Sequence, residues 1–230
     1  MTKRTALVTG ASRGIGAAIA ARLHVSGWNL SLGMRKPKHP VFDESGACHL
    51  FPYDAETGGE DTWVVEAKRR FGRIDAVIAC AGIMIPRTIL SADDEEIDRQ
   101  MAVNVKAPRR LVRAAWSDLK QARHGRVIIL ASLSGQRVKS AASGAYSVSK
   151  FAAVALSHAI RQEGWEHGIR ATAICPSYVN TDMARAITDF DPDRMTDPDT
   201  IAQAAELILN FPDTASVAEF NVNCMLEPSF

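Results

Sequence analysis

Cysteine is scarce in this sequence, and the four cysteines present are widely separated. Cys48, Cys80, Cys175 and Cys224 form no CxxC pair, which argues against a disulfide framework and indicates a reducing compartment. The apolar run at residues 6–8 is too short for the core of a signal peptide. We therefore predict a cytoplasmic location.

Long apolar stretches and an excess of one charge are also lacking. No segment approaches the roughly 20 apolar residues that a membrane-spanning helix needs. Lys and Arg total 27 while Asp and Glu total 26, so no large net charge favours nucleic acid or a membrane surface. The six histidines are dispersed without metal-ligand spacing. These absences predict no nucleic-acid partner, no membrane partner and no metal in the chemistry.

What the sequence does contain is an alternation of short apolar runs with longer helical patterns. The apolar runs show no polar alternation, which is typical of strands covered on both faces in a parallel sheet. The expected strands are Thr5–Thr9, Asn29–Gly33, Ala47–Phe51, Asp75–Cys80, Arg126–Ser132, Ile169–Cys175 and Phe220–Cys224. The expected helices are Gly14–Ser26, Thr57–Phe71, Asp93–Lys120, Gly144–Glu163 and Pro198–Asn210.

This alternation predicts an α/β fold: a doubly wound parallel sheet of about seven strands with helices on both faces. No linker-like stretch divides residues 1–230, so we expect a single domain. Pro108 interrupts one of the helical patterns, and a kink or break is expected near Lys106.

Three glycines lie in seven residues between the first strand and the first helix. Gly10 supplies a tight turn, Gly14 allows close approach of a pyrophosphate, and Gly16 allows the helix to pack on the sheet. The open N–H groups of the helix start suit a phosphate. A plain strand-to-helix turn would also account for three glycines, so position after the first strand is what favours the binding turn.

Tyr146 and Lys150 stand four residues apart in a predicted helix, so their side chains lie on the same face. A free phenol titrates near 10, and a cation about 4 Å away lowers its pKa towards neutrality. The pair is therefore a candidate acid and base. Ser132 ends the preceding strand, on the sheet edge where ligands bind, and its hydroxyl can steady a developing alkoxide.

The chain resembles the short-chain dehydrogenase/reductase family over nearly its whole length. The segment Thr9–Gly16 matches the family's cofactor turn almost letter for letter, and Tyr146 with Lys150 matches its Tyr-x-x-x-Lys signature. The resemblance implies that Ser132 orients a carbonyl and that Tyr146 gives or takes a proton. Lys150 would lower the pKa of Tyr146 and bind the nicotinamide ribose, and Asn104 would complete a proton relay.

The cofactor implied by the resemblance is a nicotinamide dinucleotide. The end of the second strand, Gly33-Met34-Arg35-Lys36, contains no Asp or Glu, whereas Arg13 and Arg35 could clasp a 2′-phosphate, so NADP(H) is expected over NAD. A basic surface loop would account equally for Arg35. The full set of expected cofactor contacts is Gly10, Ser12, Arg13, Gly14, Ile15, Gly16, Arg35, Asp54, Ala81, Gly82, Tyr146, Lys150, Pro176, Val179 and Thr181.

Two segments depart from the family pattern. Ser177 replaces the usual glycine after Pro176. The segment Ala79–Gly82 lacks the two asparagines usually found there, which leaves some hydrogen bonds between sheet and turn without donors. We expect these changes to affect local bonding and not the chemistry.

The expected activity is the interconversion of a carbonyl and an alcohol on a small molecule. A 3-oxoacyl reductase and a nicotinamide-dinucleotide sensor without turnover are the alternatives. The region 182–198 is expected to form a short lid. A homo-oligomer, dimer or tetramer, is implied by the family through its two long helices. Candidate substrate-lining residues are Met84, Ser134, Ser143, Tyr178 and Met183.

Overall fold

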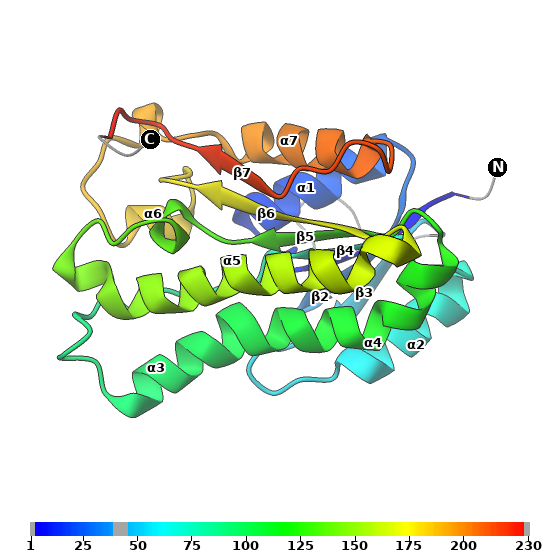
Figure 1. The fold of residues 1–230 in the computed structure, drawn as a ribbon, viewed down its shortest axis with the longest axis horizontal. Helices are drawn as coiled ribbons and strands as arrows, with labels where there is room; N and C mark the ends of the chain where they lie inside the picture. Colours follow the sequence, from blue (N-terminus) through cyan, green and yellow to red (C-terminus); the bar gives the residue numbers. More distant parts are fainter. Residues whose placement is uncertain (1–2, 39–45, 228–230) are drawn as a thin grey trace.

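The computed structural model describes residues 3–38 and 46–227. Within them, seven parallel strands form one sheet in the order β3-β2-β1-β4-β5-β6-β7 (Figure 1). The predicted fold class is confirmed. The strands are β1 (Thr5–Thr9), β2 (Asn29–Met34), β3 (Cys48–Pro52), β4 (Ala76–Ala79), β5 (Arg126–Leu130), β6 (Arg170–Pro176) and β7 (Glu219–Val222).

Helices cover both faces of the sheet because successive strand residues point to opposite sides. Leu7 packs towards the face covered by α2 (Glu60–Phe71), α4 (Ala107–Gln121) and α5 (Gly144–Gly164). Val8 packs towards α1 (Gly14–Val25) and α7 (Pro198–Asn210) on the other face (Figure 1). Each face thus has its own apolar core, and every central strand is buried on both sides.

The long helical pattern does not break at Pro108. It comprises α3 (Asp94–Met101), a π-helical turn (Ala102–Lys106) and then α4, so the expected kink near Lys106 is corrected to a π turn within a continuous helix. Pro108 sits in the first turn of α4. Proline has no N–H, so the carbonyl of Asn104 four residues earlier lacks its usual α-helical donor. The wider π turn accommodates that gap.

The order of the strands creates a binding crevice. β1 lies between β2 and β4, so the chain reverses direction across the sheet at the carboxyl ends of β1 and β4. Around this edge lie α6 (Asp182–Arg185) and short 3₁₀ turns at Leu133–Gly135, Ala141–Ser143 and Pro192–Arg194. A further 3₁₀ turn, Trp165–His167, follows α5. Among the described residues, no helix is long and apolar enough to cross a membrane.

Candidate active site

The glycine turn connects β1 to α1 in a shape that side chains would obstruct. Gly10 and Gly14 adopt left-handed φ values of 64° and 55°. A Cβ on Gly16 would lie 2.4 Å from the carbonyl oxygen of Gly10. A Cβ on Gly10 would lie 2.9 Å from the backbone nitrogen of Ala81, in the turn after β4. The backbone is therefore open at the start of α1, as a dinucleotide pyrophosphate requires.

Thr9 takes part in this turn, although it was not among the predicted cofactor contacts. Its hydroxyl accepts hydrogen bonds from the backbone N–H groups of Cys80 and Ala81, at 3.0 and 2.9 Å. Thr9 is buried. The threonine supplies a connection from β1 to the turn after β4, in the segment where the expected asparagines are missing.

We expect Thr9→Val to destabilise the fold by about 1–3 kcal/mol, because two buried N–H groups lose their acceptor. Thr5→Val is the matched control, since the described residues offer the buried Thr5 hydroxyl no hydrogen-bond partner. Urea unfolding of both variants measures the difference. Equal free energies of unfolding for the two would show that the Thr9 bonds do not hold the turn.

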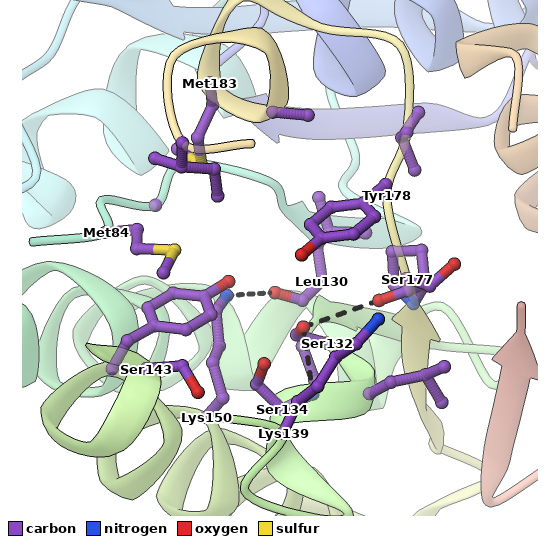
Figure 2. Close-up of a pocket in the computed structure, with 18 of the residues that line it drawn as sticks. Met84, Leu130, Ser132, Ser134, Lys139, Ser143, Lys150, Ser177, Tyr178 and Met183 are labelled. Carbon is purple, nitrogen blue, oxygen red and sulfur yellow. Dashed lines mark hydrogen bonds between the residues drawn. The ribbon is translucent and has the colours of Figure 1, made fainter. Parts of the chain in front are cut away.

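Ser132, Tyr146 and Lys150 line one pocket at the carboxyl edge of the sheet (Figure 2). Ser132 follows β5, where its hydroxyl donates to the Pro176 carbonyl at 3.4 Å and accepts from the Ser134 N–H at 3.1 Å. The Lys150 ammonium donates to the Leu130 carbonyl at 2.9 Å. The first turns of α5 thus bring the phenol and ammonium to the end of β5, as predicted.

The electrostatics of this trio differ from the prediction. Burial raises the pKa of Tyr146 to about 12, and the nearby Ser132 hydroxyl lowers it only partly. Burial also lowers the pKa of Lys150 to about 8. The expected lowering of the tyrosine pKa by Lys150 is therefore wrong here. The ammonium lies 5.6 Å from the centre of the Tyr146 ring, and desolvation is the largest influence on the pKa of both groups.

This burial predicts a pH dependence of stability. Between about pH 8 and the ordinary lysine range near 10.5, the unfolded chain binds more protons at Lys150 than the folded chain does. Stability from this group therefore rises with pH across that window. We expect the wild-type protein to gain free energy of unfolding relative to Lys150→Met as pH increases from 8 to 10. Urea midpoints at three pH values measure it, and parallel curves would contradict a buried, desolvated ammonium.

Asn104 lies in the π turn behind the pocket. Its amide donates to the Ile83 carbonyl and to the Ser149 hydroxyl, both at 2.9 Å, and accepts from the Ile83 N–H at 2.9 Å. A Cβ on Gly82 would lie 3.3 Å from the Asn104 oxygen and 3.7 Å from the Lys150 nitrogen. The asparagine therefore fixes the turn after β4 against α5 and lies close to Lys150.

The other predicted cofactor contacts follow the same edge of the sheet. Ile15, Gly82, Pro176, Val179 and Thr181 line the pocket. Residues farther along the edge lie outside the pocket: Gly10, Ser12, Arg13, Gly14, Gly16, Arg35, Asp54 and Ala81.

The two candidate phosphate-binding arginines are exposed and differ in their surroundings. Arg13 pairs with Asp182 at 3.3 Å, and both side chains are exposed. Arg35 lies just after β2 and is exposed. Asp54, after β3, accepts from the Glu56 N–H at 3.0 Å. Arg35 thus places an exposed positive charge on the side of the crevice next to β2.

The predicted substrate-lining residues Met84, Ser134, Ser143, Tyr178 and Met183 all line the pocket (Figure 2). Sequence reasoning missed Arg137 and Lys139, which also line it. No motif marks them, and a basic surface loop is the ordinary interpretation of such residues. Only the fold shows that this loop borders the pocket.

Ser177, the departure from the usual glycine, connects β6 to the carboxyl-terminal segment. Its hydroxyl donates to the Cys224 sulfur at 3.3 Å and accepts from the Cys224 N–H at 3.0 Å. Its own N–H donates to the Val222 carbonyl at 2.8 Å. The serine thus holds the segment that follows β7 beside the pocket.

The family model for short chain dehydrogenases matches residues 4–192. This chain belongs to the short-chain dehydrogenase family. The family consists of oxidoreductases acting on CH–OH and C=O groups, and the described fold and the expected motif positions agree with it. Members bind a nicotinamide dinucleotide, for which the open glycine turn and the adjoining pocket provide a fitting site.

Curated relatives are similar over almost the whole chain. An agropine synthesis reductase of Rhizobium rhizogenes is 36% identical over 228 residues, covering 96% of this chain and 52% of that protein. The chain thus spans about half the length of that relative. An uncharacterized oxidoreductase of Staphylococcus aureus is 32% identical, covering 96% of this chain and 97% of its own.

Solved structures of this family share the fold. An alcohol dehydrogenase from Thermococcus sibiricus, complexed with 5-hydroxy-NADP, is 26% identical, with a TM-score of 0.87. The similarity covers 99% of this chain and 100% of the dehydrogenase. A short chain dehydrogenase from Burkholderia cenocepacia in complex with NADP has a TM-score of 0.85, covering 97% of each chain at 22% identity, and so shows the fold alone.

Proposed function

We propose that the protein is an NADP(H)-dependent oxidoreductase that interconverts a carbonyl and an alcohol on a small molecule. The observation that carries this proposal is the position of Ser132, Tyr146 and Lys150 in one pocket beside the open glycine turn. A hydroxyl, a phenol and an ammonium around a single cavity can bind an oxygen and exchange a proton with it.

In the reduction, the Ser132 hydroxyl donates a hydrogen bond to the substrate carbonyl oxygen and fixes its position. A nicotinamide held by residues such as Val179 and Thr181 would supply the hydride for the carbonyl carbon and would accept one in the reverse direction. Tyr146 transfers its proton to the carbonyl oxygen as negative charge develops there. Lys150 stabilises the resulting phenolate and returns a proton to it, while Asn104 positions the turn beside Lys150 and completes the relay.

The proton transfer has to overcome the burial of the phenol. A tyrosine pKa of about 12 makes Tyr146 a reluctant acid in the unliganded pocket. A hydrogen bond from the Ser132 hydroxyl favours the phenolate form of Tyr146. A positive charge that moves closer to the phenol when ligands bind favours it as well. Formation of the complete complex is thus the step that activates Tyr146 in this proposal.

NADP(H) is the proposed cofactor because the residues directly after β2 are Arg35 and Lys36, with no carboxylate at either position. The complex of the similar alcohol dehydrogenase with 5-hydroxy-NADP supports this choice. Gly10, Ser12, Arg13, Gly14, Ile15 and Gly16 would hold the phosphates, and Asp54 the adenine. Ala81, Gly82, Tyr146, Lys150, Pro176, Val179 and Thr181 would hold the nicotinamide end.

The proposal extends to organisation and setting. We place the dinucleotide site and the chemistry in one domain, residues 1–230, working in the cytoplasm as a homo-oligomer. Val148 and Phe151 are exposed on α5, which supports association through this helix. Dimer and tetramer differ in mass enough for sedimentation analysis to distinguish them.

The deciding experiment measures oxidation of NADPH and NADH against a panel of aldehydes, ketones and a 3-oxoacyl thioester. We expect turnover with NADPH, and we expect Arg35→Ala to raise KM for NADPH about tenfold while leaving KM for NADH unchanged, because a charge-assisted hydrogen bond to the 2′-phosphate is lost. Cofactor binding without turnover on any carbonyl would indicate a sensor. Equal effects of Arg35→Ala on both cofactors would remove NADP preference from the proposal.

A further inference from the structure

The charges around the pocket are unbalanced. Of the described residues that line it, Arg137, Lys139 and Lys150 are basic, and none is acidic. Lys150 is buried at the end of β5, next to Tyr146. Arg137 and Lys139 come from the loop between the 3₁₀ turns that precede α5. Lys139 lies on the side of the pocket that holds Ser132 and Tyr178 (Figure 2). A pocket with this lining favours an anionic ligand.

The outer pair of basic residues already binds a carboxylate from the same chain. Arg137 donates two hydrogen bonds to Glu227, both at 2.7 Å, one from Nε and one from Nη2. The Lys139 ammonium lies 3.3 Å from the same carboxylate. The Glu227 side chain is 11% exposed, and its pairing with Arg137 lowers its pKa to about 2. The geometry is that of a bidentate carboxylate site.

The pair does more than anchor the carboxyl-terminal segment. Ser177 already holds Cys224 through two hydrogen bonds, and Leu226, next to Glu227, is 96% exposed. The Lys139 ammonium also lies 5.0 Å from the centre of the Tyr178 ring, inside the pocket lining. Lys139 therefore lies against both the Glu227 carboxylate and the interior of the pocket.

We propose that Arg137 and Lys139 form a carboxylate-binding subsite for the substrate, and that Glu227 competes for it from within the chain. The substrate class is then a carbonyl compound that carries a carboxylate away from the reacting carbon. The carbonyl oxygen binds at Ser132 and Tyr146 while the carboxylate binds at the rim. This inference rests on the proposed function for the reacting end and on the Glu227 contacts for the anionic end.

The test compares charged and neutral aldehydes of equal length. The charged series runs from 4-oxobutanoate to 6-oxohexanoate, and the unbranched alkanals of the same carbon number are the neutral partners. Spacing between carbonyl and carboxylate is thereby scanned. We expect the oxo acids to show KM values about tenfold below those of the alkanals at one chain length, because a charge-assisted hydrogen bond is gained. The difference shrinks as ionic strength rises.

Three variants test which residues cause the lower KM for the oxo acids. Lys139→Met keeps the aliphatic stem and is expected to raise KM about tenfold for the oxo acid only. Glu227→Gln removes the competitor and is expected to lower that KM about threefold while leaving the alkanal unchanged. Glu206→Gln is the matched control, because Glu206 pairs with Arg22 at 2.6 Å on α7 and α1, outside the pocket lining. It is expected to change neither KM.

Binding of the oxo acids to the NADPH-loaded protein, measured by calorimetry, separates the two proposals. Turnover of alkanals with no preference for oxo acids would overturn the subsite and leave the proposed function standing. Binding of oxo acids that Lys139→Met weakens, without turnover of any aldehyde, would overturn the function and support the subsite. A Glu227→Gln variant with higher KM for both series would assign the tail a structural role and overturn the competition.

Discussion

Tyr146→Phe is expected to lower kcat for carbonyl reduction by about 10²- to 10⁴-fold, because the reaction loses its general acid. The ring remains, so the packing of this buried side chain and the binding of the cofactor are expected to persist. Stopped-flow and steady-state measurements of NADPH oxidation give the rate, and fluorescence titration gives the Kd of the cofactor. A fall in kcat much larger than the change in cofactor Kd is the predicted signature, because Tyr146 is one of several residues proposed to hold the nicotinamide end.

The matched control is Tyr53→Phe, which removes another buried phenol hydroxyl outside the pocket lining. Tyr53 donates to Glu60 at 2.9 Å and packs on Trp63. We expect this variant to lose some stability and to keep its kcat. If Tyr146→Phe retained kcat within a factor of about three, another group would have to supply the proton, and Tyr146 would leave the proposed mechanism.

Gly16→Ala has the second largest expected effect, and it acts through the backbone. The new Cβ would lie 2.4 Å from the Gly10 oxygen and 3.1 Å from the Thr9 oxygen, and neither can rotate away. We expect a loss of about 1–3 kcal/mol in the free energy of unfolding from this overpacking. A displaced glycine turn also predicts at least about tenfold weaker NADPH binding, the equivalent of roughly 1.4 kcal/mol.

Gly46→Ala provides the comparison, because a Cβ there meets none of the described residues within 4 Å. Urea unfolding and NADPH titration on both variants compare an added methyl group at a crowded glycine with one at an uncrowded glycine. Normal binding and stability in Gly16→Ala would mean that α1 can shift outward without disturbing the turn. The tight contact between the helix start and the strand end would then be unimportant to the site.

Much of this architecture could be predicted from local sequence patterns. Apolar runs gave the strands to within a few residues, as at Arg126–Leu130, because a parallel strand is buried on both faces and has little tolerance for polar side chains. The glycine spacing and the Tyr146–Lys150 pair also predicted a site at the carboxyl edge of the sheet, where the structure places Tyr146 and Lys150 in one pocket. Backbone geometry, which short motifs encode directly, was the predictable part.

The remaining features depend on contacts between distant segments. The π turn at Ala102–Lys106 arises where Pro108 meets the packing of Asn104 on Ile83, which helical periodicity alone does not report. The raised pKa of Tyr146 depends on burial, and helical spacing specifies only the neighbouring charge. The pairing of Arg137 with Glu227 joins residues 90 positions apart. No local pattern contains that information.

The strand order has a consequence for how this molecule can diversify. The glycine turn and the basic side of the crevice come from residues before 80, whereas Ser132, Tyr146 and the loop with Lys139 come from residues after 130. Within the sheet, the two contributions meet where β4 pairs with β5. Recombination between family members at the start of β5 would therefore exchange Ser132, Tyr146 and the Lys139 loop as a block while the glycine turn and Arg35 stayed intact. Such chimaeras retain a continuous sheet because β4 and β5 pair through backbone atoms alone.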